Sequence, residues 1–404
     1  MIFATYYFLA LCLLFFPVYW CVKNTRFRLG WLLAACLLFQ FHYAGAAGVG
    51  PILLLGVAVY FLGLSDDRRL LLGGIILCVC TLVFYKYTVF LSVDLIGMFH
   101  PATGRLLGEW VRHHLPPTPP LAVSFFAFEF IHYLVDRCKG TLAMRNPLQF
   151  GVFSLFFPTL VAGPIKRYEQ FLPSVGDGIA KVDSRDVMTG LVQASLGYSK
   201  KMVADNLALW IAHSQPGFDH LSLGMRWAVF AAIALRILFD FSGYSDIAIG
   251  IARMMGIRVP ANFNWPYSST SIRDFWHRWH ISLSLWIRDY VYIPLGGSRH
   301  GAFRRFLNGL AAFSLCGLWH GPSWNFVLWG LYHGIGLSAC TAYEHVPLGI
   351  GQALKATFIR IPLLGWILTL LFVCFGWLLF FYPVHEALRM AELLVPIELP
   401  KLRM

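Results

Sequence analysis

Long apolar segments fill most of this 404-residue chain, and they limit its fold more than any other feature. Hydrophobic residues make up 58% of the sequence, whereas charged residues make up only 13%. That charged share is about half the usual one, so a water-exposed globular surface cannot be built from it. We therefore predict an integral membrane protein. The composition also excludes a disordered, collagen-like or nucleic-acid-binding chain.

The apolar segments predict an all-α, multi-pass fold. A spanning helix needs about 20 apolar residues, so a chain of this length has room for about ten to twelve helices. The glycine-rich sequence from Gly45 to Pro51 is predicted to be a turn between two of them. Because no internal repeat is visible, we treat residues 1–404 as a single domain. The apolar segments used for this prediction are residues 2–22, 29–45, 51–64, 70–91, 121–135, 303–320, 322–343 and 363–382.

Basic residues gather in alternate connecting loops, which predicts an orientation in the membrane. Cytoplasmic loops carry an excess of Lys and Arg, so the loops around Lys23, Arg68 and Arg137 are placed in the cytoplasm and the N-terminus outside. This pattern accounts for the net charge of +12 without an anionic polymer as a partner. The outer segment 92–120 ends in prolines at 116–120, which cannot be helical.

Two stretches depart from the pattern of spanning helices. Residues 150–162 are apolar but short, and Pro158 and Gly163 interrupt them, so we predict a short or re-entrant element shielded from lipid. Residues 240–299 are too polar to face lipid, and ionisable groups at membrane depth must pair or face water. A polar interior is therefore expected. The ionisable residues concerned are Arg236, Asp240, Asp246, Arg253, Arg258, Arg273, Asp274, Arg278, Arg288 and Asp289.

Two histidines lie in apolar or aromatic surroundings, His280 after a tryptophan-rich cluster and His320 near the end of an apolar segment. Each is consistent with a hydrogen-bonded structural residue or with a group that exchanges a proton near neutral pH. For His277 we expect a role at the cytoplasmic surface. Asp274, His277 and His280 are spaced three residues apart and could share one helix face, as metal ligands do. However, the sequence lacks a His-Glu-x-x-His pattern, and we predict no metal. A Gly-x-Ser-x-Gly elbow and a nucleotide-binding glycine loop are absent as well.

Several motifs in order along the chain resemble the membrane-bound O-acyltransferase (MBOAT) family. The resemblance is densest over residues 121–334 and points to the bacterial branch with the alginate O-acetylation and teichoic-acid D-alanylation membrane proteins. The motifs are Val123-Ser-Phe-Phe-Ala-Phe128, Phe157-Pro-Thr-Leu-Val-Ala-Gly-Pro-Ile-Lys-Arg-Tyr168, Asp240-Phe-Ser-Gly-Tyr-Ser-Asp246, Asn262-Phe-Asn-Trp-Pro-Tyr267, Phe275-Trp-His-Arg-Trp-His280, Leu318-Trp-His-Gly321 and Trp329-Gly-Leu-Tyr-His-Gly334.

The resemblance implies a helical membrane fold around a central tunnel, in which a cytoplasmic acyl thioester meets an acceptor hydroxyl from the other side. It implies that His320 and His280 are catalytic, with His320 as the base and His280 orienting or stabilising the intermediate. For His333 a packing role is expected. No permanently bound cofactor is implied; the donor is acetyl-coenzyme A or an acyl-phosphopantetheinyl carrier protein. Residues that bind this donor cannot be assigned, but Arg273, Arg278, Arg288 and Arg299 are candidates to attract it.

The resemblance also implies a bacterial cytoplasmic membrane, surrounding membrane lipids and an extracytoplasmic partner of the esterase-like SGNH type. Acetyl transfer to an extracytoplasmic polysaccharide is the first reading, because the segments 262–267 and 292–298 look like the acetylation branch. The alternative is carrier-protein-dependent D-alanyl transfer to a cell-envelope polymer. A transporter is a third reading, disfavoured because the polar motifs lie in the second half of the chain with no counterpart before residue 120.

Overall fold

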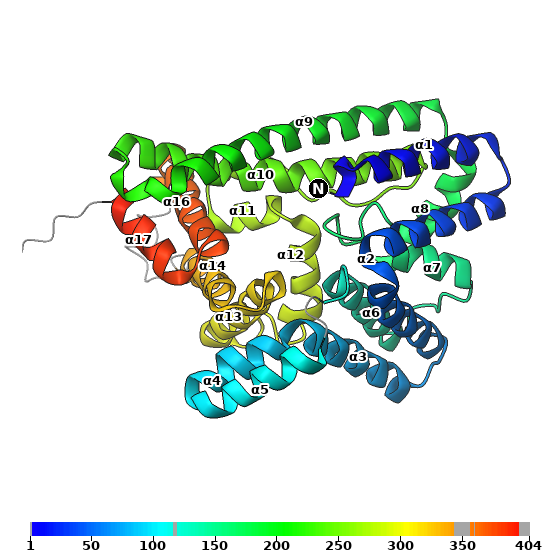
Figure 1. Cartoon of the computed structure of the whole chain (residues 1–404), viewed down its shortest axis with the longest axis horizontal. Helices are drawn as coiled ribbons and strands as arrows, with labels where there is room; N and C mark the ends of the chain where they lie inside the picture. The colour runs from blue at the N-terminus through cyan, green and yellow to red at the C-terminus, as the bar shows by residue number, and fades with distance from the viewer. Residues whose placement is uncertain (1, 116–118, 343–355, 359, 396–404) are drawn as a thin grey trace, which may run out of the picture. The chain divides into compact units, whose positions relative to one another are not determined.

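The computed structural model describes residues 2–115, 119–342, 356–358 and 360–395, and these residues form helices without any strand (Figure 1). The predicted all-α fold is confirmed. The chain divides into two compact units, Met1–Gly197 with Tyr244–Ala261, and Tyr198–Gly243 with Asn262–Met404. The long helices α9 (Ser184–Ser214) and α10 (Leu223–Met254) contribute residues to both units.

The other elements are assigned to the units by sequence. The first unit contains η1 (Ile2–Ala4), α1 (Tyr6–Cys21), α2 (Thr25–Gly63), α3 (Arg68–Leu82), η2 (Val83–Tyr87), η3 (Phe90–Leu95), α4 (Ile96–Phe99), α5 (Pro101–His114), α6 (Val123–Cys138), α7 (Pro147–Leu155) and α8 (Tyr168–Lys181). The second contains η4 (Gln215–His220), η5 (Pro266–Ser268), α11 (Ile272–Arg278), α12 (Ile281–Ile287), η6 (Arg288–Tyr292), α13 (Gly301–His320), α14 (Trp324–Ala342), α16 (Pro362–Phe381) and α17 (Val384–Leu394).

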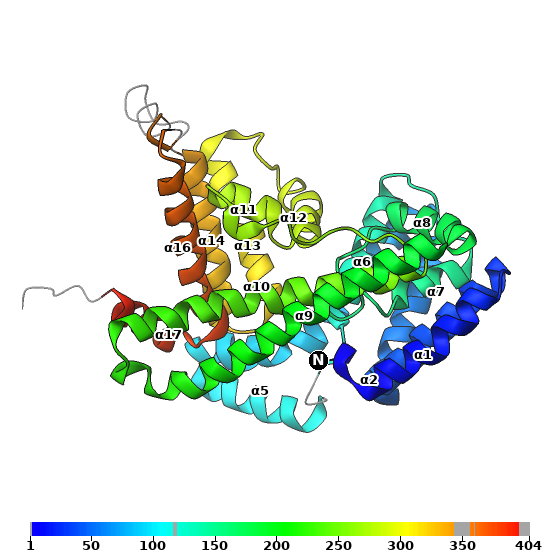
Figure 2. The ribbon, with the colours of Figure 1, turned by 90° about the horizontal axis from the view of Figure 1, so that it is seen from above.

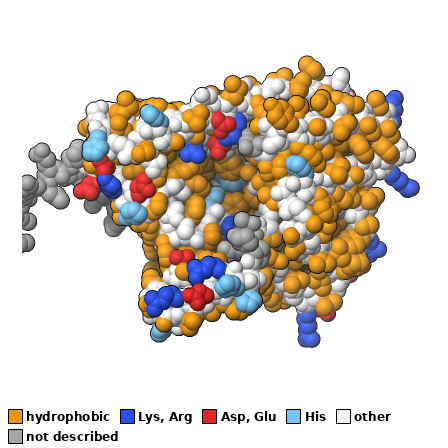
Figure 3. Space-filling view, viewed as in Figure 1, with side chains coloured by type: hydrophobic (Ala, Val, Ile, Leu, Met, Phe, Trp, Pro, Cys, Tyr) orange, Lys and Arg blue, Asp and Glu red, His pale blue; other side chains and the backbone are white. Residues whose placement is uncertain are grey.

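Among the described residues, three helical segments are long and apolar enough to cross a membrane: Thr25–Gly63, Arg68–Tyr87 and Pro362–Phe381. Their outer faces carry large exposed apolar side chains such as Leu54 and Ile76. Figure 3 shows that hydrophobic side chains cover most of the visible surface over α1, α2 and α3. Such a surface is stable only when it contacts lipid.

The predicted turn at Gly45–Pro51 is instead a kink within one helix. Gly45 alone takes a non-helical conformation, with φ 65° and ψ 170°, and α2 continues through Pro51 to Gly63. Because glycine has no Cβ, it reaches this positive φ without steric cost, and the chain returns to the helical conformation at the next residue. The predicted non-helical proline segment at 116–120 falls mostly outside the described residues, since 116–118 are not described.

The apolar stretch 150–162 forms no spanning helix, as the sequence predicted. The helix α7 ends at Leu155, and turns follow up to residue 163. Phe156, Phe157 and Leu160 in these turns are at most 1% exposed. This irregular backbone is therefore shielded by protein, as a membrane environment requires.

A buried ion pair joins α6 to the segment that follows α7. Lys166 Nζ contacts Glu129 Oε1, and the two side chains are only 1% and 3% exposed. The ammonium group also lies 5.2 Å from the ring centroid of Phe153 and 5.6 Å from that of Phe171. Each charge is taken out of water, so each depends on the other for its stabilisation.

We expect Lys166→Met to reduce the free energy of unfolding by about 3–5 kcal/mol, because it leaves Glu129 buried without its cation. Thermal unfolding of the purified protein in detergent measures this loss. The matched control is Lys181→Met, which removes an ion pair to Asp177 whose two side chains are each 77% exposed. It should cost less than about 1 kcal/mol. Equal losses in the two variants would contradict the role of the buried pair.

Candidate active site

His280 lies in a strained position between two short helices. It joins α11 to α12 in the left-handed conformation, with φ 42° and ψ 53°. For a residue with a Cβ this conformation costs about 1–2 kcal/mol. The side chain is 1% exposed, and neither ring nitrogen has a hydrogen-bond partner among the described residues. Strain together with unpaired buried nitrogens is typical of a functional site.

The Asn-Phe-Asn sequence at 262–264 holds His280 in this conformation by hydrogen bonds on both sides of it. The backbone N–H of Ile281 donates to the Asn262 carbonyl oxygen at 3.0 Å, and the Ser282 hydroxyl donates to Asn262 Oδ1 at 2.6 Å. On the other side, the N–H of Asn264 donates to the Arg278 carbonyl oxygen at 3.0 Å. The Asn-Phe-Asn motif therefore fixes the backbone on both sides of His280, a role that the sequence alone did not show.

His320 is the last residue of α13, and it is half-buried. The helix ends there because Gly321 is extended, with φ −164° and ψ 150°. A Cβ on Gly321 would lie 2.1 Å from a ring atom of Phe326. The glycine of the Trp-His-Gly motif therefore lets α14 pack directly beside the catalytic candidate.

The helices α13 and α14 approach each other at glycines. A Cβ on Gly317 would lie 2.1 Å from the carbonyl oxygen of Phe326, and one on Gly330 would lie 2.2 Å from that of Phe313. In Figure 2 the two helices run side by side, with α16 next to α14. This backbone contact fixes the end of α13, where His320 is located.

The two histidines meet at Trp319. The ring centroid of Trp319 is 6.1 Å from that of His280 and 4.8 Å from that of His320. Burial lowers the pKa of His280 well below its usual value, and the nearby His320 imidazole lowers it further. His280 lies outside the three long apolar segments. It is therefore neutral near neutral pH, with one ring nitrogen able to donate and the other able to accept.

A cavity of about 350 Å³ lies in the second unit, and residues close in sequence to each histidine line it, although the histidines themselves do not. Ile281, which follows His280, and Cys316, one helical turn before His320, belong to its lining. Basic groups line it together with apolar ones, so it can hold a molecule with an anionic part and an apolar part. The polar and basic lining residues are Arg273, His277, Ser284, Arg288, Tyr292, Arg305 and Ser338.

The four arginines that the sequence predicts to attract the acyl donor have different surroundings in the structure. Arg273 and Arg288 line the cavity, although Arg288 also pairs with Asp289 at 2.6 Å. Arg278 pairs with Asp274 at 2.8 Å, and it and Arg299 lie outside the lining. Arg305 was missed, because nothing in its sequence surroundings sets it apart from Arg304. His277 is exposed and lines the cavity. Within the described ranges no three potential metal ligands form a group.

His333 is fully buried on α14 and lies beside the candidate site. Its ring centroid is 4.9 Å from that of Trp329 and 5.1 Å from that of Trp276. Neither ring nitrogen has a hydrogen-bond partner among the described residues. These aromatic contacts are those of a packed side chain, and a packing role for His333 stays a prediction.

Comparison with known proteins matches residues 137–385 to the membrane-bound O-acyltransferase family. The probable alginate O-acetylase of Pseudomonas aeruginosa is 35% identical over 393 residues, covering 94% of this chain and 72% of the relative. The peptidoglycan O-acetyltransferase of Helicobacter pylori is 35% identical over 400 residues, covering 89% and 72%. The teichoic acid D-alanyltransferase of Bacillus subtilis is 29% identical over 294 residues, covering 67% and 72%.

We expect Gly317→Ala to lower the stability of the protein by about 1–3 kcal/mol, because the added methyl group pushes α13 away from α14. Thermal unfolding in detergent measures the effect. Gly309→Ala is the control on the same helix, since the nearest atom to its added methyl is Ser338 Oγ at 3.8 Å. Unchanged stability in the Gly317 variant would show that the two backbones can separate without cost.

Proposed function

Because the chain belongs to the membrane-bound O-acyltransferase family, we propose that this membrane-embedded enzyme moves acetyl groups from a cytoplasmic thioester to hydroxyls of a cell-surface polysaccharide. The alginate and peptidoglycan O-acetylating relatives support acetyl as the acyl group, since they match about nine tenths of the chain. The D-alanyl-transferring relatives match a smaller share at lower identity, and D-alanyl transfer remains the alternative.

One observation carries the proposal for the catalytic residues. His280 and His320 come from different parts of the sequence, yet the rings of both contact the Trp319 ring. Ile281 and Cys316, which are near them in sequence, line one cavity with basic and apolar walls. Their environments differ, since His280 is buried and neutral whereas His320 is half-buried. Different surroundings are one way in which two similar groups come to take different roles in a site.

In the proposed reaction the acceptor hydroxyl oxygen attacks the thioester carbonyl carbon while His320 takes the hydroxyl proton. The neutral His280 imidazole donates a hydrogen bond to the carbonyl oxygen as negative charge develops on it. The carbon–sulfur bond then breaks, and His320 returns the proton to the leaving thiolate. The rings of Trp329 and Phe380, 5.2 Å and 5.0 Å from that of His320, limit access of water and so disfavour hydrolysis.

We expect His320→Ala to reduce acetyl transfer by about 10²–10⁴-fold, because the general base is lost. His280→Ala should reduce it by about 10²–10³-fold through loss of the oxyanion donor. The assay offers radiolabelled acetyl-coenzyme A to the purified protein and follows thioester loss and labelled product.

The control is His213→Ala, an exposed histidine on α9, which should leave the rate unchanged. Full activity in a folded His320→Ala variant would contradict the assignment. Consumption of donor only with an acyl-loaded carrier protein would favour D-alanyl transfer, and failure with both donors in the wild type would reopen the transporter hypothesis.

The cavity beside the histidines is the proposed site of the acyl donor. Coenzyme A and phosphopantetheine both carry phosphate groups, which Arg273, Arg288 and Arg305 can attract. The apolar lining residues, among them Ile281 and Cys316, suit the pantetheine arm and its thioester.

We expect Arg305→Gln to raise the KM for acetyl-coenzyme A about tenfold with little change in kcat, which corresponds to about 1.4 kcal/mol of binding energy. Initial rates at several donor concentrations measure both constants. Arg299→Gln removes an exposed arginine outside the cavity lining and is the control. An equal rise of KM in both variants would show that overall surface charge, and not a contact with Arg305, determines donor binding.

We place the enzyme in the bacterial cytoplasmic membrane and propose an extracytoplasmic SGNH-type protein as its partner, which passes the acetyl group on to the polymer. The resemblance to the bacterial branch supports both parts. Transfer of the acyl group to the outer side requires an acceptor hydroxyl on that side. A hydroxyl of a separate protein can serve as this acceptor.

A further inference from the structure

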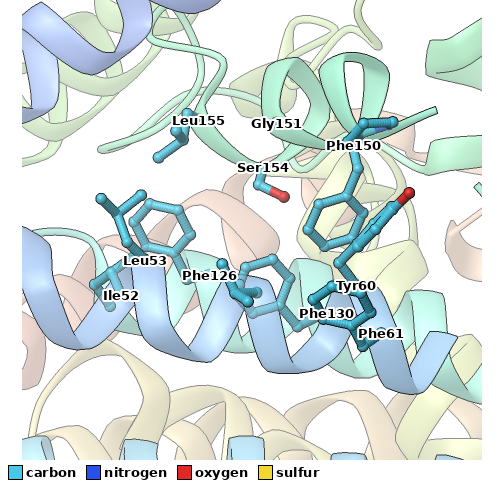
Figure 4. Close-up of a pocket in the computed structure, with 13 residues that line it drawn as sticks. Ile52, Leu53, Tyr60, Phe61, Phe126, Phe130, Phe150, Gly151, Ser154 and Leu155 are labelled. Carbon is cyan, nitrogen blue, oxygen red and sulfur yellow. The ribbon is translucent and has the colours of Figure 1, made fainter.

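A second cavity, of about 320 Å³, lies in the first unit between α2, α6 and α7 (Figure 4). None of its lining residues belongs to the unit that contains His280 and His320. The proposed acyl transfer gives it no role. Its lining consists of Ile52, Leu53, Gly56, Val57, Tyr60, Phe61, Phe126, Phe130, Pro147, Phe150, Gly151, Ser154 and Leu155.

One polar side chain faces this apolar space. Ser154 is 4% exposed, and its hydroxyl has no hydrogen-bond partner among the described residues. A serine within a helix often donates to the carbonyl four residues earlier, but Ser154 does not. In Figure 4 the hydroxyl points into the space above the rings of Phe126 and Phe130. A buried unpaired hydroxyl costs about 1–3 kcal/mol, which a ligand oxygen could offset.

The cavity opens on the lipid-facing side of α2. Its lining residues Val57 and Phe61 are 55% and 65% exposed, and they lie on a helix long and apolar enough to cross a membrane. Gly56 carries no side chain on this wall, and a Cβ there would lie 3.5 Å from the ring of the lining residue Phe130. The apolar molecule most abundant at such a surface is a lipid acyl chain.

A cationic residue stands near one end of the cavity. The Tyr60 hydroxyl, which belongs to the lining, donates to the Arg145 carbonyl oxygen at 2.8 Å. Arg145 itself is exposed and lies two residues before the lining residue Pro147. Its guanidinium group is thus available to a phosphate at the membrane surface.

We propose that this cavity binds one phospholipid as a structural ligand. An acyl chain lies between α2, α6 and α7 against the phenylalanine rings, and the Ser154 hydroxyl donates to an ester carbonyl oxygen. Arg145 attracts the headgroup phosphate. The bound lipid connects three helices of the first unit and stabilises them together.

The test uses the purified full-length protein and phosphatidylglycerol that carries a diazirine in its acyl chain. We expect light-induced labelling to concentrate on peptides that contain residues 52–61 and 150–155. Ser154→Phe fills the cavity and should abolish most of this labelling. Leu54 is 72% exposed on α2, outside the cavity lining, so Leu54→Phe adds the same ring without filling the cavity and should leave the labelling unchanged. Labelling spread evenly over the apolar helices, or unaffected by Ser154→Phe, would overturn the proposal.

Ser154→Ala provides a second test that does not depend on tolerance of a large side chain. In lipid-free detergent this variant should melt at the same or a higher temperature than the wild type, because an unpaired buried hydroxyl is removed. Added phosphatidylglycerol should raise the melting temperature of the wild type more than that of the variant. Equal shifts in the two proteins, or an equal shift with oleic acid in place of the phospholipid, would contradict the proposed contacts.

Discussion

The direct contact between the backbones of α13 and α14 is the constraint on which the candidate site depends. Two helices come this close only where side chains are missing, and Gly317 and Gly330 provide that gap. The contact carries Trp319 and His320 at the end of α13, and Trp329 and His333 on the facing helix. Close packing at these glycines thus fixes the backbone position of His320, whereas hydrogen bonds to Asn262 fix that of His280. One histidine is held by close packing and the other by polar contacts.

The two histidine side chains therefore have different surroundings. His280 is enclosed, strained and neutral, so it suits a fixed hydrogen-bond donor. His320 lies at a helix end and is half-buried, so its imidazole is less enclosed than that of His280. The Trp319 ring contacts both imidazole rings. Division of labour between similar groups by their surroundings is a general way to obtain acid–base chemistry near neutral pH.

Much of the fold could be predicted from the sequence, because apolar segments of sufficient length have few alternatives to a helix. The pairing of His280 with His320 came from the family resemblance, and the residues alone left each role open. The kink at Gly45 was mistaken for a turn, since glycine and proline mark either one. Arg305 and the left-handed backbone of His280 could not be found, because both depend on tertiary contacts. The same is true of Glu129 and Lys166, which are 37 residues apart.

That separation has a consequence for how the protein is made. Lys166 is 37 positions after Glu129, so at about 5–20 residues per second the ribosome reaches it about 2–7 seconds later. During this interval α6 holds a carboxyl group that lipid cannot solvate, so it either stays protonated or remains near water and the insertion machinery. The ion pair itself can form only after Lys166 has been made. The stabilisation that this pair gives to α6 therefore comes from a segment that is synthesised later than the helix.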